Sequence, residues 1–389
     1  MQRLLEKISI LSLSLMLVST FAVSPAIPAM ISHFGHTGYQ PQQVEFLITV
    51  TSFAIMASLF LNPLYMRVLT ERQIISLGLI LVAIGGGLPL LTQLYPVIFA
   101  GRILLGIGLG MINARAINIV STHYTGKERL QMMGWRGSME VLGSASLTAL
   151  VGGLLAFGWH KVFAIYPLAL IILVLYLLYV PQDSPSKVAV EASLPKGNLS
   201  AEQWRQALGL AFIAFFVINV NSALTLKIPT IVQVSGLGTA QQASLILSAM
   251  MLMGILAGIA FGSLFGQLKD RLLGLSVLIF STCILLTSLS TSLVLLSLSA
   301  VISGFFYSII LTVVFNKASE KTPKHLLNTV MTVVLVGCNL GGATSSLVPP
   351  ILEKLNQHSS GAFGIYAGLG ILLSTILLFT LKKGVRQKS

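Results

Sequence analysis

Three ionisable residues of this 389-residue chain lie inside long apolar runs, where a charge is costly. Arg102 and Arg115 fall in the run near 96–120, and Glu140 falls in the run near 133–156. Ionisable groups within membrane-spanning segments are rare, and they face a partner, a cavity or a permeation path. The chemistry that they offer is binding of an anionic group, formation of an internal ion pair, or uptake and release of a proton.

Arg115 and Glu140 are predicted to lie opposite each other, because the hairpin between their two runs is centred near Lys127. An ion pair between them is the main interpretation. A proton-binding or substrate-binding role for Glu140, or a cytoplasm-facing position, is the alternative. Arg136 and Glu140 are spaced four residues apart and could instead pair along one helix. Glu140 is the best-placed carboxylate for carrying a proton, and Glu45, at the outer mouth of the second run, is a weaker candidate.

Helical phase separates the two arginines. Arg102 and Asn113 are 11 residues apart, which at ~100° per residue leaves them about 20° apart around a helix. Arg115 is 13 residues from Arg102 and falls about 220° away from it. We therefore expect Arg102 and Asn113 to face a substrate cavity and Arg115 to face a neighbouring helix.

The elements that must position these residues are membrane helices. Charged residues make up 9% of the chain and hydrophobic residues 55%, and nearly all the charge sits in short breaks between apolar runs. A helix needs ~20 mainly apolar residues to span a bilayer. By that criterion the chain is an all-α membrane protein with twelve transmembrane helices. They lie near 7–30, 43–65, 74–94, 96–120, 133–156, 162–180, 206–228, 241–264, 272–290, 293–316, 327–351 and 362–381.

The net charge of +13 has a better explanation than nucleic-acid binding. If the N-terminus is cytoplasmic and the chain crosses twelve times, most of the 24 Lys and Arg residues lie on the cytoplasmic side, as the positive-inside rule requires. We predict a multi-pass protein of the cytoplasmic (inner) membrane, in contact with lipid and not with nucleic acid, with both termini in the cytoplasm. His, Cys, Asp and Glu do not occur at metal-ligand spacing, so neither a metal nor another cofactor is expected.

The longest polar stretch, 181–205, is interpreted as a cytoplasmic linker. It divides the chain into an N-terminal six-helix bundle at 1–180 and a C-terminal six-helix bundle at 206–389. The two halves look alike: the segment 150–155 at the end of the fifth run resembles 347–352, about 197 residues later. Two pseudo-symmetric bundles of this kind are a common transporter architecture.

A glycine-rich motif that begins with Arg102 is the most specific pattern in the chain. It reads RILLGIGLG at 102–110, and its glycines would let another helix approach closely. The end of helix 1 adds PAIP at 25–28, and the connection of helices 5 and 6 adds GGLLAFGWHKVF at 152–163. With these motifs the chain resembles the major facilitator superfamily, of the twelve-helix, bacterial efflux-like type, over essentially its whole length.

Two features depart from the family pattern. The loop after helix 2 keeps Arg67 but has Met66 where the family has an acidic residue, whereas the second copy, after helix 8, keeps Asp270 and Arg271. The resemblance implies that Arg67, Asp270 and Arg271 act in conformational change. The antiporter motif of helix 5 has Gly-Pro where this chain has Thr-Ala, at 148–149, which weakens the inference of antiport.

Helices 1, 4, 7 and 10 line the substrate path in that family, so the resemblance implies that Asn219 and Asn221 of helix 7 contact the substrate. Interhelical hydrogen bonds are an equally open role for both amides. Tyr307 on helix 10 is a further candidate substrate contact, and Asn339 on helix 11 is a weaker one, since packing explains both side chains as well.

The predicted function is secondary active transport of a small solute by alternating access. Proton-coupled efflux is the first expectation, and uptake or uniport of a small organic anion is the alternative. A sensor that no longer transports and a membrane enzyme are less favoured, because no cluster of catalytic groups is present in the sequence. The expected partners are the solute, protons and the lipid bilayer, and the protein is expected to act as a monomer.

Overall fold

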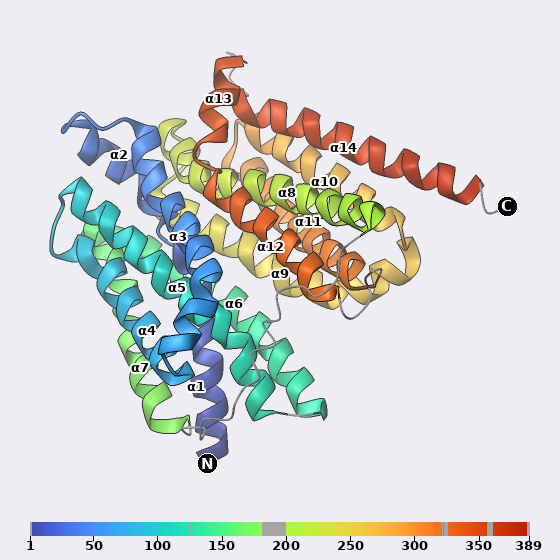
Figure 1. The fold of residues 1–389 in the computed structure, drawn as a ribbon. Helices are drawn as coiled ribbons and strands as arrows, with labels where there is room; N and C mark the ends of the chain where they lie inside the picture. The colour runs from blue at the N-terminus through green and yellow to red at the C-terminus, as the bar shows by residue number, and fades with distance from the viewer. Residues whose placement is uncertain are drawn as a thin grey trace. The chain divides into compact units, whose positions relative to one another are not determined.

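The computed structural model describes residues 2–124, 126–180, 200–320, 322, 326–355 and 361–386. Every regular element in these ranges is helical (Figure 1). Most of the predicted linker, 181–199, lies outside the described residues. Contacts between Cα atoms divide the chain into unit 1, Met1–Leu194, and unit 2, Pro195–Ser389, and each unit is described by itself.

Unit 1 contains seven α-helices and five short 3₁₀ segments within the described residues. Helices α3, α5 and α6 are the longest, with 28, 29 and 29 residues. The elements are α1 (Gln2–Leu17), η1 (Ser19–Phe21), η2 (Ser24–Ala26), α2 (Ile27–Gly35), α3 (Pro41–Val68), α4 (Glu71–Gly87), η3 (Leu88–Leu90), α5 (Tyr95–His123), α6 (Gly126–Leu154), η4 (Leu155–Phe157), η5 (Trp159–Ile165) and α7 (Leu168–Tyr179).

Unit 2 is built from α-helices alone in its described part. Its first helix, α8, is the longest described helix at 34 residues and begins with a capping box of Ser200 and Gln203. The elements are α8 (Ala201–Val234), α9 (Ala240–Leu268), α10 (Arg271–Ser288), α11 (Leu293–Glu320), α12 (Leu327–Ala343), α13 (Val348–Leu355) and α14 (Gly361–Arg386).

The predicted membrane crossings are present in the described residues as ten single helices and two bent pairs. The ten helices are long and apolar enough to span a bilayer, and counting each bent pair as one span raises the number to twelve. The first span bends by 47° between Arg3–Leu17 and Ser19–Gly35, and the eleventh bends by 62° between Thr329–Ala343 and Val348–Lys354. The sequence predicted continuous helices at both places, so the extents agree and the bends were missed.

Local chemistry explains both bends. In the first span, Pro25 and Pro28 each remove a backbone donor, and the Ser24 hydroxyl donates to the carbonyl of Phe21 (2.6 Å). In the eleventh, Thr344 and Ser345 donate to backbone carbonyls one turn earlier (both 2.7 Å), just before Pro349-Pro350. Such side-chain bonds offer the backbone an alternative to the helical ladder.

Close helix pairs recur in the two units. Helix α3 packs against α5 and α1 against α6, and in the same way α9 packs against α11 and α8 against α12. Gly106 makes the α3–α5 contact possible, because a Cβ atom there would collide with the carbonyl oxygen of Thr51. Gly304 has the same role on α11, against the carbonyl of Met250 on α9. The close approach predicted for the glycines of the 102–110 motif is therefore confirmed.

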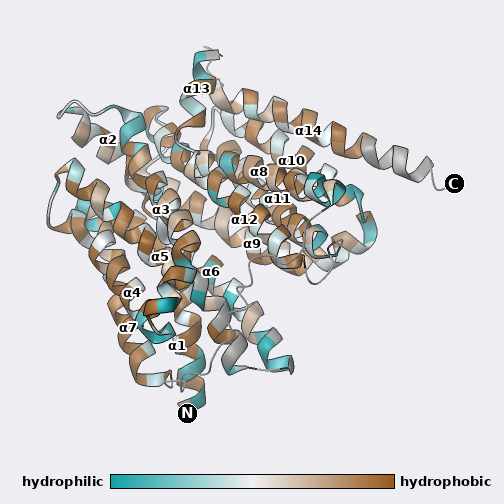
Figure 2. Cartoon of the chain, viewed as in Figure 1, coloured by the Kyte–Doolittle hydropathy of each residue, from teal (hydrophilic) through white to brown (hydrophobic). Residues whose placement is uncertain are grey.

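The helices carry hydrophobic residues along their lengths, and hydrophilic residues gather near helix ends (Figure 2). Side chains such as Phe280 and Val313 are fully buried inside unit 2. Others, such as Ile259, at 76% exposure, and Leu298, at 57%, point away from the protein. Large apolar side chains that face outward all along a helix are expected where the surrounding medium is lipid.

Candidate functional site

Arg102 is one of the largest fully buried side chains of the structure, with 1% of its surface exposed. Its Nε donates to the carbonyl of Leu47 on α3 (3.0 Å), and its Nη1 donates to the hydroxyl of Tyr166 (2.9 Å). Its Nη2 donates to the carbonyl of Thr20 in η1 (3.4 Å). One guanidinium group on α5 thus joins three other parts of unit 1.

The groups that accept hydrogen bonds from Arg102 are all uncharged. The cation also lies 5.7 Å from the ring centres of Phe163 and of Tyr166, a separation at which the π face of an aromatic ring attracts a positive charge. Carbonyl dipoles and aromatic rings therefore replace the water around this charge. The sequence predicts Arg102 as a substrate contact, and the structure instead commits three of its N–H groups to acceptors of unit 1.

Tyr166, which the sequence analysis did not single out, completes this cluster. Its hydroxyl accepts the bond from Arg102 and donates to the carbonyl of Ser19 (3.1 Å). Ser19 and Thr20 lie where the first span bends, and side chains donate to both of their carbonyls, although that of Ser19 also accepts from the backbone N–H of Ala22. Gly86 on α4 leaves room for the tyrosine ring, since a Cβ atom at this position would overlap it.

Asn219 has a comparable role in unit 2, although it lies on α8, the first crossing of its unit, whereas Arg102 lies on the fourth crossing of unit 1. Its Nδ2 donates to the carbonyl of Gly341 (3.1 Å) and to the hydroxyl of Thr344 (3.0 Å), at the bend of the eleventh span. Its Oδ1 accepts from the hydroxyl of Tyr366 on α14 (2.6 Å). Of the two roles left open for Asn219, helix–helix hydrogen bonding is the one whose contacts are present.

A repeated tetrapeptide could have revealed the two tyrosines. Residues 163–166 read FAIY and residues 363–366 read FGIY, 200 positions apart. Both tyrosines are buried, at 0% and 3% exposure, and each binds the buried polar side chain that supports a bent span. The offset is close to the 197 residues found from other segments, so this match belongs to the same internal repeat.

Three other predicted substrate contacts keep polar atoms uncommitted. Asn221 is half-buried, and its Oδ1 is shielded from solvent without a hydrogen bond to any described group. Asn113 is half-buried in α5, and no hydrogen bond joins its side chain to the described residues. Tyr307 is half-buried in α11 near Cys338. Asn339, in contrast, donates to the carbonyl of Leu335 one turn before it (2.9 Å).

Glu140 forms its ion pair with Arg136, one turn earlier on α6. The two side chains are 25% and 16% exposed, respectively. The ion pair predicted between Glu140 and Arg115 is wrong, because the closer arginine on the same helix takes the carboxylate. The alternative pairing, at a spacing of four residues, is the one that forms.

Arg115 is 3% exposed on α5. The acidic group whose charge acts on it is Glu71, in the first turn of α4. Its Nε is buried and makes no hydrogen bond to a described group. The expectation that Arg115 faces a neighbouring helix, not an open cavity, agrees with this burial.

Glu45 is far more enclosed than the sequence suggested. It lies in the second turn of α3 and only 1% of its surface is exposed, whereas the apolar pattern placed it at an open outer mouth. It is thus a second intramembrane carboxyl group beside Glu140.

The loops predicted to act in conformational change differ in their contacts. Asp270 pairs with Lys317 at the end of α11 (3.1 Å), which ties the α9–α10 connection to another helix. Arg67 and Arg271 are exposed, and the side chain of neither forms a hydrogen bond or an ion pair with another described residue. Lys269, beside Asp270, has φ 46° and ψ −125°, a strained conformation for a residue with a Cβ atom.

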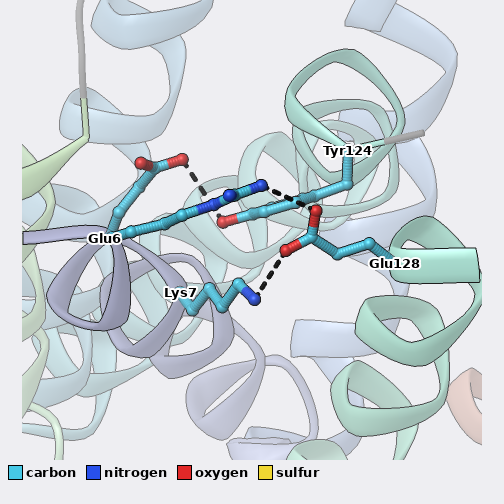
Figure 3. A network of polar contacts seen from close by, with 5 residues as sticks. Glu6, Lys7, Tyr124 and Glu128 are labelled. Carbon is cyan, nitrogen blue, oxygen red and sulfur yellow. Dashed lines mark hydrogen bonds and ion pairs between the residues drawn. The ribbon is translucent and has the colours of Figure 1, made fainter.

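A second polar network ties the start of α1 to the α5–α6 connection (Figure 3). Glu128 binds Lys7 (2.6 Å) and Arg3 (2.9 Å), and the Tyr124 hydroxyl donates to Glu6 (3.3 Å). Burial, and then the nearby Glu6 carboxylate, raise the pKa of the Tyr124 hydroxyl, so it remains a donor at neutral pH. The sequence alone does not reveal Glu128 as the acidic partner of Arg3 and Lys7.

No cluster of three His, Cys, Asp or Glu side chains suited to a metal ion occurs in the part of the chain that the structure describes. The described cysteines, Cys283 and Cys338, are both free thiols.

Comparison with known proteins decides the family. A family model described as Major Facilitator Superfamily matches residues 9–346 and, in an overlapping match, residues 237–388. The chain belongs to the Major Facilitator Superfamily. It is therefore a multi-pass membrane protein and a secondary transporter, not an enzyme. None of the curated proteins matches it.

Solved structures of several other transporters share its fold. A POT family transporter in complex with 5-aminolevulinic acid is 14% identical, with a TM-score of 0.77 over 98% of this chain and 96% of that one. A D-xylose-proton symporter is 17% identical, with a TM-score of 0.72 and 95% of both chains covered. A bacterial homolog of the human lysosomal transporter Spinster is 16% identical, with a TM-score of 0.70 over 97% and 95%. At these identities the likeness concerns the fold alone.

Proposed function

We propose that this superfamily member moves a small solute across the cytoplasmic membrane by alternating access, coupled to protons and in the direction of export. Alternating access exposes one binding site to each side of the membrane in turn. The observation that carries the coupling is the Arg136–Glu140 ion pair inside an apolar span, in which Glu140 stays 25% exposed. A proton that reaches Glu140 would break this pair and change the electrostatics of α6.

The substrate class follows from which polar groups are still uncommitted. Arg102 and Asn219 already bind groups of their own units, so we assign them to helix support. Asn113, Asn221 and Tyr307 are half-buried and offer amide and hydroxyl groups. These groups suit an uncharged or anionic solute with hydrogen-bonding atoms, and they suit a cationic drug poorly because none is acidic.

Export is proposed from the resemblance of the chain's motifs, among them the one at 152–163, to the family as a whole. The competing proposal is uptake or uniport of a small organic anion. It is favoured if the Arg136–Glu140 pair never opens, since Glu140 then carries no proton. Thr148-Ala149, in place of the antiporter Gly-Pro, also weighs toward this alternative.

The test uses purified protein in liposomes with a pH-sensitive dye in the lumen. Pools of solutes are added across an imposed pH gradient, and both proton flux and solute movement are followed. We expect solute-dependent proton flux that is lost in Glu140→Gln. Glu320→Gln is the matched control, because this carboxylate is exposed at the end of α11.

Each outcome separates the two proposals. Solute movement without proton flux in the unaltered protein would replace coupled export by uniport. Proton flux that persists in Glu140→Gln would shift the coupling role to another group, with Glu45 tested next. The sign of the flux, with the proton moving opposite to the solute or with it, distinguishes antiport from symport.

A further inference from the structure

Unit 2 contains a pocket of about 230 Å³ at the end where α8 begins and α11 finishes. Helices α8, α10, α11, α12 and α14 all contribute to its wall. The pocket lies wholly within one unit, and none of the predicted substrate contacts lines it. Its residues are Gln203, Arg205, Gln206, Ala207, Gly209, Leu210, Ile213, Leu273, Lys317, Ala318, Thr322, Val330 and Leu377.

The floor of the pocket is apolar and well packed. Ala207, Ile213, Leu273, Ala318 and Val330 line it, and each is less than 9% exposed. They come from four different helices, so the floor is a property of the folded unit and not of one segment. A cavity with such walls binds an apolar chain and gains little from water.

The rim is basic. Arg205 and Lys317 both line the pocket. Arg205 is exposed and forms no ion pair with any described carboxylate. Lys317 is bound to Asp270 on one side (3.1 Å), and Trp204, next to Arg205, is 42% exposed. Exposed tryptophan beside a base is typical of a helix end at the level of lipid head groups.

We propose that this pocket binds an anionic phospholipid of the surrounding bilayer, with part of one acyl chain on the apolar floor and the phosphate at Arg205. Charge complementarity selects this occupant: the floor matches a hydrocarbon chain, and the polar side chains among the lining residues are basic, amide and hydroxyl groups without a carboxylate. A zwitterionic lipid would bring its own cation to the same rim, so it binds more weakly. The site serves lipid-dependent stability of unit 2, independently of the transported solute and of the direction of transport.

A larger side chain at Gly209 would fill the pocket. It lines the cavity, and a Cβ atom built on it meets nothing within 4 Å. Gly209→Leu therefore puts an apolar side chain into the space reserved for the acyl chain without a clash. Gly258→Leu is the matched control, because Gly258 on α9 is equally open and does not line the pocket.

The experiment measures thermal unfolding of the full-length protein in detergent during titration with phosphatidylglycerol, with phosphatidylcholine, or with inorganic phosphate. A ligand that binds only the folded state raises the unfolding temperature as its concentration exceeds the dissociation constant. We expect a saturable rise with phosphatidylglycerol that is much larger than the rise with phosphatidylcholine or phosphate.

The variants assign the effect to the pocket. Arg205→Gln should weaken phosphatidylglycerol binding about tenfold or more, as expected for one charge-assisted hydrogen bond, and Gly209→Leu should remove the saturable rise. Arg129→Gln, which deletes an exposed base of unit 1, and Gly258→Leu should behave as the unaltered protein.

Three results would overturn the proposal. Equal shifts with the two lipids would remove the charge selectivity, and an equal shift with phosphate alone would remove the acyl chain. A full phosphatidylglycerol response in Gly209→Leu would show that the lipid binds elsewhere on the protein, whatever Arg205→Gln does.

Discussion

In unit 1 a buried arginine supports the bend of a membrane span, whereas in unit 2 an uncharged asparagine does so. Arg102 and Asn219 each make three hydrogen bonds, and each bonds a tyrosine from the last crossing of its unit. The bent spans differ, since unit 1 bends its first crossing and unit 2 its fifth. The repeat has thus preserved the tyrosine, whereas the polar side chain that it binds comes from the fourth crossing in unit 1 and from the first crossing in unit 2.

The difference has a physical consequence. A guanidinium inside a low-dielectric protein carries a large desolvation penalty, and in unit 1 only carbonyls, a hydroxyl and two aromatic rings offset it. An amide costs less to bury, and its partners in unit 2 retain other bonds: the Thr344 hydroxyl also donates to Leu340. The stability of unit 1 should therefore depend on its polar cluster more strongly than the stability of unit 2 depends on the cluster around Asn219.

The largest expected effect is that of Arg102→Leu compared with Asn219→Leu. Removing Arg102 takes away the side-chain donor of the Thr20 carbonyl and of the Tyr166 hydroxyl, together with its bond to the Leu47 carbonyl inside α3, and the free energy of unfolding should fall by about 2–4 kcal/mol. Asn219→Leu should cost about half as much, because Thr344 keeps a partner. Unfolding in detergent, followed by denaturant or temperature, measures both.

The same pair of variants tests the substrate role predicted for Arg102. If Arg102→Leu abolished transport while the unfolding temperature stayed unchanged, the arginine would be a substrate contact and not a support. Equal losses of stability in the two variants would show that the charge gives unit 1 no special dependence.

A smaller effect is expected for the two tyrosines. The Tyr166 hydroxyl accepts a hydrogen bond from Arg102 and donates one to Ser19, whereas the Tyr366 hydroxyl makes a single hydrogen bond to a described residue, Asn219. Tyr166→Phe should lower the free energy of unfolding by about 1–2 kcal/mol and Tyr366→Phe by about 0.5–1 kcal/mol. Both changes keep the ring, so packing is the same before and after. The reverse order of the two losses would contradict the comparison.

The smallest effect concerns the loops that follow α3 and α9. Leu69 ends α3 in an ordinary extended conformation (φ −116°), whereas Lys269 ends α9 at φ 46°. Strain of this kind costs about 1–3 kcal/mol, so Lys269→Gly should stabilise unit 2, less the roughly 0.5–1 kcal/mol of backbone entropy that glycine adds. Leu69→Gly incurs the entropy cost alone and should destabilise unit 1. Opposite shifts of the unfolding temperature are the expected result, and shifts of the same sign would refute the strain.

The two bends were not predicted from the sequence. An apolar run of about 25 residues predicts a crossing because length and hydropathy suffice for that, and neither property tells a straight helix from a broken one. The prolines at 25 and 28 and at 349–350 were visible in the sequence. Whether a helix breaks near them depends on whether neighbours can bind the carbonyls at the bend, and Arg102 and Asn219, from distant positions, bind those of Thr20 and Gly341.

The ionisable residues show the same limit. Spacing alone allowed Glu140 to pair with Arg115 across a hairpin or with Arg136 along a helix, and the structure forms the second pair. Glu45 was assigned to an open mouth from its place near the end of a run, but the fold covers it completely. Helical phase correctly separated Arg102 from Arg115, yet it could not say that both would be buried.

Hydropathy, charge distribution and motif spacing are local properties of the chain, so they were enough to predict the membrane class, the number and order of the crossings, the internal repeat and the family. The places where two crossings bend, the arginine that pairs with Glu140, and the part of Tyr166 and Tyr366 in the polar clusters became visible in the folded chain. The bends and the two tyrosine clusters depend on hydrogen bonds between residues 64 to 147 positions apart. Such bonds form only when close helix packing has brought their donors and acceptors together in a medium without competing water.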